Sequence, residues 1–189
     1  MSRRPAGNPE GVSRGRFSEL ECFVLGLVWQ NGPCSPYEVR RRMADSPSTQ
    51  WSGSAGAIYP LMRKLERLGL LQGRAERTGN RRRREYGLTG RGRGALRDWI
   101  GPPLPKEAVS VGYDPLRSRA RFLWALTPER RRRWLRDAEA ALEEVERRVR
   151  RWQKTYGGNA DPMLALITRH GELEVAFRRA WLQELGATL

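Results

Sequence analysis

Two Ser-x-x-Glu signals stand close together in the first quarter of the chain, and they constrain the fold more than any other feature. Ser18 is followed three residues later by Glu21, and Ser35 is followed at the same spacing by Glu38. This spacing is typical of a capping box, in which each side chain hydrogen-bonds the backbone of the other residue at a helix start. The Asn-Gly-Pro sequence at 31–33 stops the first helix. The sequence therefore predicts two short helices joined by a tight turn.

A third helix is predicted in residues 54–71, SAGAIYPLMRKLERLGLL, because apolar residues recur there at steps of three and four. Pro60 interrupts the pattern, since proline lacks a backbone donor and crowds the preceding turn. If the regular helix begins near Ala57, Pro60 lies in the first turn and no hydrogen bond is lost. If it begins at Ser54, Pro60 bends the helix. The small residues of the SGSAG stretch before it predict a phosphate site at the helix start.

A β-hairpin is predicted directly after the third helix. Leu70 and Leu71 precede one extended run, Tyr86 and Leu88 lie in another, and Thr-Gly-Asn at 78–80 is a turn signal between them. Three short helices followed by a hairpin are the elements of a winged helix-turn-helix. The arginines around the turn are either a solvated charge run or, beside DNA, matched to phosphates. Because the run lies on a wing, we favour DNA contact, and the net charge of +15 separately favours a polyanionic partner.

At this point the chain resembles the PadR-like transcriptional regulators. The resemblance covers residues 18–100 and is carried by LGLVWQNGPCSPYEVRRRM, GAIYPLMRKLERLGLL and RRRREYGLTGRGRGAL. Ser-Pro stands at 35–36, where the family usually has His-Gly, and Thr-Gly-Arg-Gly at 89–92 replaces Thr-Glu-Glu-Gly, which adds positive charge near the DNA. The resemblance implies that the third helix is the recognition helix, with Tyr59 and Pro60 near its beginning.

The predicted DNA contacts lie on the second and third helices, on the stretch before the third helix, and on the wing. Tyr59 is expected to contact a phosphate or a base, as tyrosine hydroxyls commonly position proteins on DNA, whereas Pro60 is expected only to shape packing. The full predicted set is Tyr37, Ser52, Ser54, Tyr59, Arg63, Lys64, Arg77, Arg81, Arg82, Arg83 and Arg84.

The second half of the chain predicts a helical dimerisation domain. We expect a mobile basic tail at 1–16, the winged helix-turn-helix at 17–100, a proline-rich linker at 101–113 and a helical domain at 114–189. Two long amphipathic helices there have wide apolar faces and no sheet to cover them, which favours a symmetric homodimer. The fold class is therefore mainly α, with a two-stranded wing. The predicted interface is Leu142, Val145, Val149, Trp152, Leu166, Phe177 and Trp181.

Catalytic, metal and membrane functions find little support in the sequence. His170 is the only histidine, Cys22 and Cys34 are twelve positions apart, and no stretch approaches the ~18 apolar residues of a membrane span. We expect no cofactor, no enzyme activity, and reduced thiols in a cytoplasmic protein. His170 lies on an apolar stripe, where a core role is the more ordinary one.

These observations predict a dimeric DNA-binding repressor acting at a palindromic operator. A small aromatic or anionic effector, which the family resemblance implies, would bind among Trp99, Trp124, Trp134 and His170; these tryptophans are equally consistent with core packing. Effector binding would then change the spacing of the two DNA-binding halves. The alternative is a winged-helix interaction module that binds protein or RNA.

Overall fold

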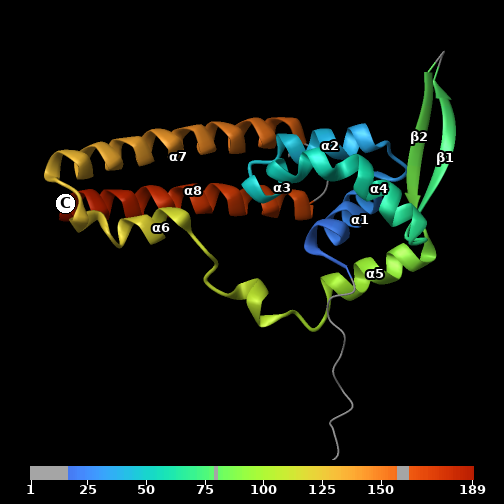
Figure 1. The fold of residues 1–189 in the computed structure, drawn as a ribbon, viewed down its shortest axis with the longest axis horizontal. Coiled ribbons are helices and arrows are strands. Elements are labelled where there is room, and N and C mark those ends of the chain that lie inside the picture. The colour runs from blue at the N-terminus through green and yellow to red at the C-terminus, as the bar shows by residue number, and fades with distance from the viewer. Residues whose placement is uncertain (1–16, 79–80, 157–161) are drawn as a thin grey trace, which may run out of the picture. The chain divides into compact units, whose positions relative to one another are not determined.

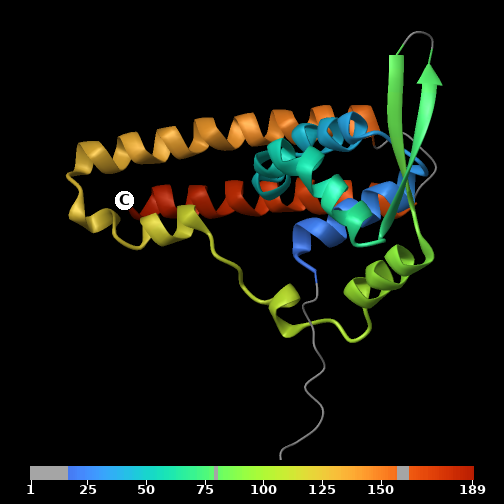
Figure 2. The ribbon, with the colours of Figure 1, turned by 45° about the vertical axis from the view of Figure 1, so that its right-hand side comes forward.

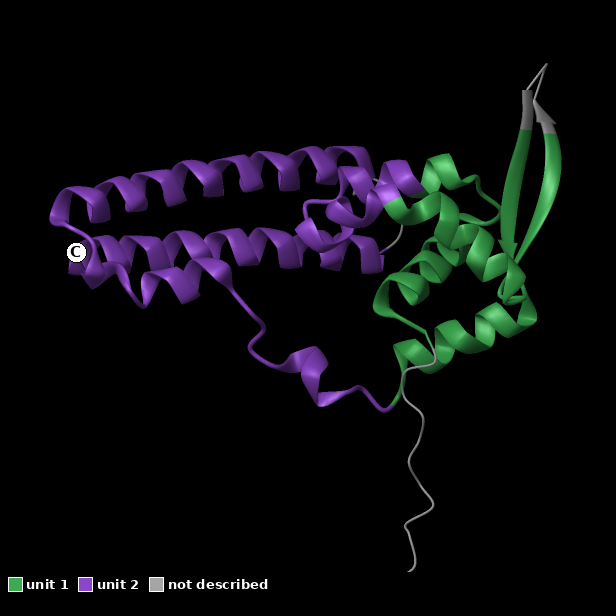
Figure 3. Cartoon of the chain, in the orientation of Figure 1, with its two compact units in different colours: residues 1–39, 57–102 green, residues 40–56, 103–189 purple. Residues whose placement is uncertain are grey.

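The computed structural model describes residues 17–78, 81–156 and 162–189 of the 189-residue chain. The predicted basic tail and the turn residues Gly79 and Asn80 lie outside the described residues. The contacts divide the chain into two compact units (Figure 3). The first contains residues up to 39 together with 57–102, and the second contains 40–56 and 103–189. Residues 40–56 therefore group with the C-terminal helices, which differs from the predicted division at residue 100.

Both predicted capping boxes are formed. At the start of α1 (Glu19–Asn31), the Glu21 N–H donates to Ser18 Oγ at 3.3 Å, and the Ser18 N–H donates to the Glu21 carboxylate at 2.7 Å. At the start of α2 (Pro36–Asp45), Ser35 and Glu38 make the same two hydrogen bonds, at 3.4 and 2.8 Å. Gly32 follows α1 with a φ of +70°, a conformation that favours glycine.

The predicted third helix, in residues 54–71, corresponds to a 3₁₀ turn and one helix, and a further short helix that was not predicted precedes them (Figure 1). These are α3 (Thr49–Ser54), η1 (Ala55–Ala57) and α4 (Ile58–Arg67). Pro60 is the third residue of α4 and lies in its first turn, which confirms the later of the two predicted helix starts. The sequence analysis did not predict α3. Its cap residue, Ser48, makes no side-chain capping bond.

The predicted wing is present as an antiparallel hairpin. Strands β1 (Leu71–Thr78) and β2 (Arg81–Leu88) pair with Leu71 opposite Leu88 and Thr78 opposite Arg81. At the root of the wing, the backbones of Cys34 and Tyr86 exchange hydrogen bonds of 3.1 and 2.9 Å. The segment after α1 therefore pairs with β2 and joins the wing to the helical core.

A helix that the sequence analysis did not predict follows the wing. Helix α5 (Gly90–Ile100) contains three glycines near its start, which weaken the helical signal. Thr89 caps it by accepting from the Gly92 N–H at 3.0 Å, and the same hydroxyl lies 3.1 Å from the Leu70 carbonyl. A Cβ atom at Gly92 would lie 2.2 Å from that carbonyl oxygen, so only glycine allows α5 to approach the start of the wing this closely.

The core of the first unit lies where α1 packs against α4, α5 and β2. The buried apolar side chains of this unit are Cys22, Val24, Leu25, Val28, Cys34, Val39, Ile58, Met62, Leu65, Leu70, Leu71, Tyr86 and Leu96.

The second unit is built on two long helices. Helices α7 (Pro128–Tyr156) and α8 (Pro162–Thr188) run antiparallel and pack side by side (Figures 1 and 2). Three shorter elements precede them: η2 (Lys106–Val109), α6 (Pro115–Ala120) and η3 (Leu123–Ala125). The side chains buried between the long helices are Leu142, Val149, Val175 and Leu182.

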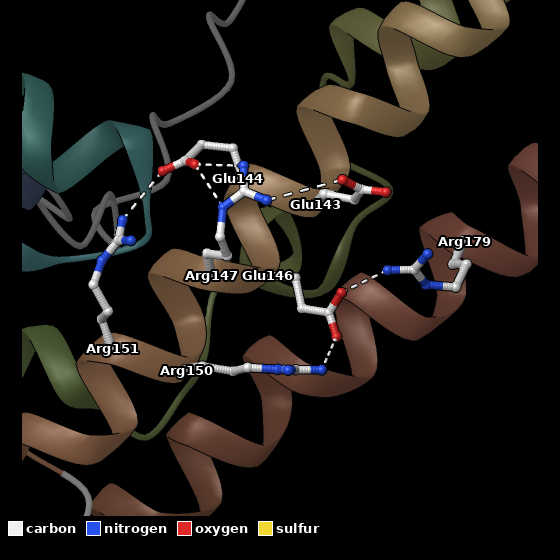
Figure 4. Close-up of polar contacts among 7 residues, drawn as sticks. All are labelled: Glu143, Glu144, Glu146, Arg147, Arg150, Arg151 and Arg179. Carbon is white, nitrogen blue, oxygen red and sulfur yellow. Dashed lines mark hydrogen bonds and ion pairs between the residues drawn. The ribbon is translucent and has the colours of Figure 1, made fainter.

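Polar contacts hold the second unit together outside that core. Glu146 on α7 pairs with Arg150 one turn later and with Arg179 on α8, both at 2.6 Å (Figure 4). Neighbouring ion pairs, which join Glu143 and Glu144 to Arg147 and Glu144 to Arg151, lie along α7 itself.

Two further hydrogen bonds explain why residues 40–56 group with this unit. Arg148 donates to the Ser46 carbonyl at 2.7 Å, and the Tyr156 hydroxyl donates to the Asp45 carboxylate. Both tie the end of α2 to the C-terminal half of α7.

Candidate nucleic-acid interface

Helix α4 presents polar residues on the surface opposite its core face. Ile58, Met62 and Leu65 are buried, whereas Tyr59 is 41% exposed and Arg63 is exposed. Tyr59 and Arg63 are four residues apart and therefore share one helical face. Arg67, four residues further on, is also exposed and was not among the predicted contacts. The spacing of four from Arg63 was the sequence signal that could have identified it.

Lys64 is engaged within the domain. Its Nζ lies 2.7 Å from the Glu21 carboxylate on α1, and the side chain of Glu21 is only 7% exposed. Although burial opposes ionisation of Glu21, hydrogen bonds from Lys64 and Ser18 hold the pKa of this carboxyl below its ordinary value. Lys64 therefore pairs with a buried carboxylate while its own side chain is 55% exposed, and its contact with DNA stays a prediction.

The wing arginines divide into two groups. The side chains of Arg77, Arg81 and Arg82 lie outside the described residues. Arg83 and Arg84, nearer the root of the wing, both make ion pairs inside the first unit: Arg83 with Glu38 at 3.4 Å, and Arg84 with Glu66 on α4 at 2.5 Å. The hydrogen bond that the Arg84 guanidinium donates to Glu66 raises the pKa of this guanidinium. The four-arginine run is therefore not uniformly available to phosphates.

The residues before α4 do not form the free helix start that the sequence predicted as a phosphate site. Ser52 and Ser54 are half-buried, and their hydroxyls donate to the carbonyls of Ser48 and Gln50, at 3.0 and 2.8 Å. Ala57 has helical backbone angles, so α4 continues from a 3₁₀ turn instead of beginning with a free set of amides. Tyr37, in the first turn of α2, is 52% exposed, as a DNA contact requires.

The four predicted effector residues belong to different units and make separate contacts. In the first unit, the Trp99 indole donates to Glu19 at 3.0 Å. In the second, Trp124 is 65% exposed beneath the Arg131 guanidinium, and Trp134 packs against the α7–α8 core. His170 is exposed, which corrects the expectation of a core histidine.

A cleft lies elsewhere in the first unit. It has a volume of about 400 Å³ and contains none of the four predicted effector residues. Its lining includes Trp29, Pro33, Gln72, Arg74 and Arg93.

The predicted dimer residues also separate into two groups. Leu142 and Val149 are buried between α7 and α8 of a single chain, and Trp181 packs against the same core. Trp152 is half-buried, with its ring 5.6 Å from that of Tyr156. Leu142 and Val149 are therefore covered within the chain and are not available to a partner, whereas an interface role for the half-buried Trp152 and Trp181 stays a prediction. Val145, Leu166 and Phe177 are 40%, 63% and 67% exposed and are accessible to a partner.

Helix α8 has a second apolar face that is exposed in the part of the chain that the structure describes. We call this face the exposed α8 stripe. It follows the helical spacing of three and four residues and contains His170 among its apolar side chains. Its apolar members are more than half exposed, and they are Met163, Leu166, Ile167, Leu173 and Phe177.

Other chemistries find no site in the described part of the chain. Within residues 17–78, 81–156 and 162–189, no three His, Cys, Asp or Glu side chains form a group that could hold a metal ion. None of the described helices is long and apolar enough to cross a membrane. Both cysteines are buried, and burial raises the pKa of the Cys22 thiol to about 11. The reactive thiolate of Cys22 is therefore scarce near neutral pH.

Comparison with known proteins identifies the class of this winged helix. Residues 24–98 match the model of the "Transcriptional regulator PadR-like family". No curated protein matches the chain significantly in sequence. Among solved structures, the PadR-like transcriptional regulator BC1756 from Bacillus cereus is similar with a TM-score of 0.71 and 21% identity, over 90% of this chain and 100% of that one.

Two structures of PadR from Bacillus subtilis are similar as well. The complex with operator DNA has a TM-score of 0.61 and 21% identity, covering 88% of this chain and 98% of that one. The complex with p-coumaric acid has a TM-score of 0.58 and 20% identity, covering 88% and 95%. The likeness extends through the long C-terminal helices and shows that the fold is shared.

Proposed function

We propose that the protein is a dimeric DNA-binding repressor released by a small molecule, on the premise that its winged helix matches the PadR-like family of transcriptional regulators over residues 24–98. The dimer occupies a palindromic operator near a promoter and blocks transcription sterically. Effector binding changes the spacing of its two DNA-binding halves and lowers operator affinity.

The surface of α4 is the observation that carries the DNA-binding part of this proposal. Tyr59, Arg63 and Arg67 recur every four residues on the exposed side of the helix, while its other side is buried in the core. A basic and aromatic face of this kind can enter a major groove or contact its flanking phosphates. The net charge of +15 supports a polyanionic partner.

The exposed α8 stripe supports the dimer. Contiguous apolar surface of this length on a helix is typical of a protein interface. A second copy of the same chain is the economical partner, because a two-fold axis buries the same stripe on both subunits. Two winged helices related in this way can contact half-sites about one helical turn apart, ~34–36 Å.

The effector part rests on the B. subtilis PadR complex with p-coumaric acid, which is an aromatic carboxylic acid. A protein of this fold and charge is suited to a ligand of the same chemical class, an aromatic anion. The second unit offers exposed Trp124 stacked on Arg131, at 4.4 Å from guanidinium to ring, as one surface with both an aromatic and a cationic component.

The test begins with the full-length protein and sheared genomic DNA, followed by sequencing of the recovered fragments. We expect a small set of fragments that share an inverted repeat. Binding of the purified protein to one such fragment should show a steep salt dependence, and mixed-sequence DNA should bind at least ~10³-fold more weakly. Release of the fragment by an aromatic carboxylic acid would support the effector. Preferential capture of RNA, or equal binding to all DNA, would contradict the proposal.

A further inference from the structure

Arg83 and Arg84, in the middle of the hairpin, leave it on opposite faces. Successive side chains of a strand alternate between its two faces, so Arg83 and Arg84 point in opposite directions. Arg83 reaches the start of α2, where its Nη2 lies 3.2 Å from Ser35 Oγ and 3.4 Å from the Glu38 carboxylate. Arg84 reaches Glu66 on α4. The hairpin is therefore held from both sides by helices of the same unit.

Glu66 joins α4 to both strands through one oxygen atom. Its Oε1 accepts from Arg84 Nη2 on β2 at 2.5 Å and from the Gly73 N–H on β1 at 3.1 Å. The two strand residues are diagonal neighbours on one face of the hairpin, since Gly73 is opposite Tyr86 and Arg84 is opposite Ala75, two residues further along β1. A bond from one helix to both strands restrains rotation of the hairpin about its root.

Gly73 makes room for this arrangement. A Cβ atom at position 73 would lie 2.6 Å from Glu66 Oε1 and 2.6 Å from Arg84 Nε. Both contacts are shorter than Cβ atoms tolerate, so any larger residue separates the carboxylate from the guanidinium. Gly73 lies in a regular strand, a backbone conformation that does not require glycine. The ion pair beside it therefore explains why a residue without a side chain stands there.

We propose that Glu66 is a positioning residue of the DNA interface, which fixes the wing relative to α4, and that Arg84 serves this ion pair and does not contact phosphate. The inference rests on the proposed DNA-binding function. An isolated two-stranded hairpin is only marginally stable, so its direction depends on what holds its root. From Gly73 to Thr78 the strand extends about 17 Å at ~3.3 Å per residue, and a 10° swing moves the tip by ~3 Å. That displacement exceeds what a hydrogen bond to a phosphate tolerates.

The sign of the Glu66→Gln effect distinguishes this proposal from ordinary electrostatics. Loss of a carboxylate from a DNA-binding surface should strengthen binding, because the carboxylate repels phosphates. If Glu66 positions the wing, the isosteric glutamine should instead weaken operator binding by roughly tenfold, the size of one charge-assisted hydrogen bond. Gly73→Ala separates the pair without changing any charge and should weaken binding by a similar factor.

The experiment measures affinity and salt dependence for full-length variants on a genomic fragment that the wild-type protein recovers. Arg84→Gln should weaken binding as Glu66→Gln does, and the double variant should be no weaker than either single one, because both remove the same contact. The slope of log affinity against log salt should stay at the wild-type value in all three. Glu76→Gln is the matched control: it removes an exposed carboxylate of the same hairpin and should leave affinity equal or higher.

Thermal unfolding of each variant shows whether it is folded. If Gly73→Ala unfolds, the charge-reversed double variant Glu66→Arg with Arg84→Glu tests the same ion pair. Recovery of affinity in the reversed pair relative to Arg84→Glu alone supports the proposal. Tighter binding by Glu66→Gln, or a slope reduced by about one unit in Arg84→Gln, overturns it, since the latter marks a phosphate contact. A wild-type protein without salt-dependent DNA binding would instead overturn the proposed function itself.

Discussion

Arg63 and Lys64 are adjacent cations on α4, yet the structure gives them different environments. Arg63 is exposed on the same face as Tyr59, whereas Lys64 pairs with the buried carboxylate of Glu21. A helix turns by 100° per residue, so neighbours in sequence face different surroundings. At the scale of single residues, the positive charges of this domain therefore divide between those that stabilise the fold and those that are available to DNA.

The Lys64–Glu21 pair predicts a pH-dependent loss of stability. Lys64→Ala leaves a buried carboxylate without its cation and should lower the free energy of unfolding by about 1–3 kcal/mol at pH 7. The folded pKa of Glu21 is lowered, so its contribution is complete above the unfolded value of about 4.3 and is lost as pH falls through the folded value. Urea unfolding at several pH values should therefore show the variant and wild type converging at acid pH. Equal stability at pH 7 would mean that the pair contributes nothing.

Arg63 predicts a loss of specificity. If its guanidinium contacts a base edge, Arg63→Ala should reduce operator binding by about 1–3 kcal/mol and reduce binding to mixed-sequence DNA much less. Fluorescence anisotropy with both duplexes measures the two losses. An equal loss on both would identify Arg63 as a phosphate contact.

At the scale of elements, the middle and the tip of the wing have different expected roles. The middle is paired to α2 and α4 through Arg83 and Arg84, and the tip carries Arg81 and Arg82 at the start of β2. A long two-stranded hairpin that is held along its length by ion pairs can present its end to a phosphate backbone. The function of the wing therefore depends on how firmly the helices hold it.

The tip predicts a salt effect. Replacing Arg81 and Arg82 together with alanine should weaken binding to all DNA sequences by a similar factor, because phosphate contacts carry charge and little sequence information. The slope of log affinity against log salt should fall by up to about two units. Unchanged affinity at moderate salt would show that the tip does not contact DNA.

At the scale of the whole molecule, the two faces of α8 have different partners. Val175 is 6% exposed in the core with α7, and Phe177, two residues later, is 67% exposed on the stripe. The first face is covered within the chain, and the second is the exposed face that we propose a second copy of the chain covers. Substitutions on the exposed α8 stripe should therefore affect assembly, and substitutions on the face packed against α7 should affect folding of the second unit.

This separation predicts opposite outcomes for two similar variants. Phe177→Glu should leave the helices folded but shift the protein toward monomer and weaken operator binding, because each half-site loses the effective concentration that its twin supplies. Val175→Glu should unfold the second unit, since it places a charge in an apolar core. Sedimentation and circular dichroism measure both effects. A wild-type protein that sediments as a monomer at micromolar concentration would contradict the dimer.

The sequence by itself determined the elements whose signals are local. The capping boxes at Ser18 and Ser35 and the hairpin that follows α4 depend on residues within a few positions of one another, whereas the first-turn position of Pro60 was one of two alternatives that the sequence left open. Helix α5 escaped prediction because its glycines weaken the local signal, and its cap at Thr89 also depends on a contact with Leu70, 19 residues earlier in the chain.

Only the tertiary structure decided which long side chains meet and which apolar faces are covered. Arg84 and Glu66 are 18 residues apart, and Arg148 and Ser46 are 102 apart, distances at which no periodicity or capping rule operates. Helix α8 is apolar on two sides, so hydrophobic spacing alone did not show that Val175 packs in the core while Phe177 faces outward. A flexible arginine can pair with any carboxylate within its reach, and the fold determines which carboxylate that is.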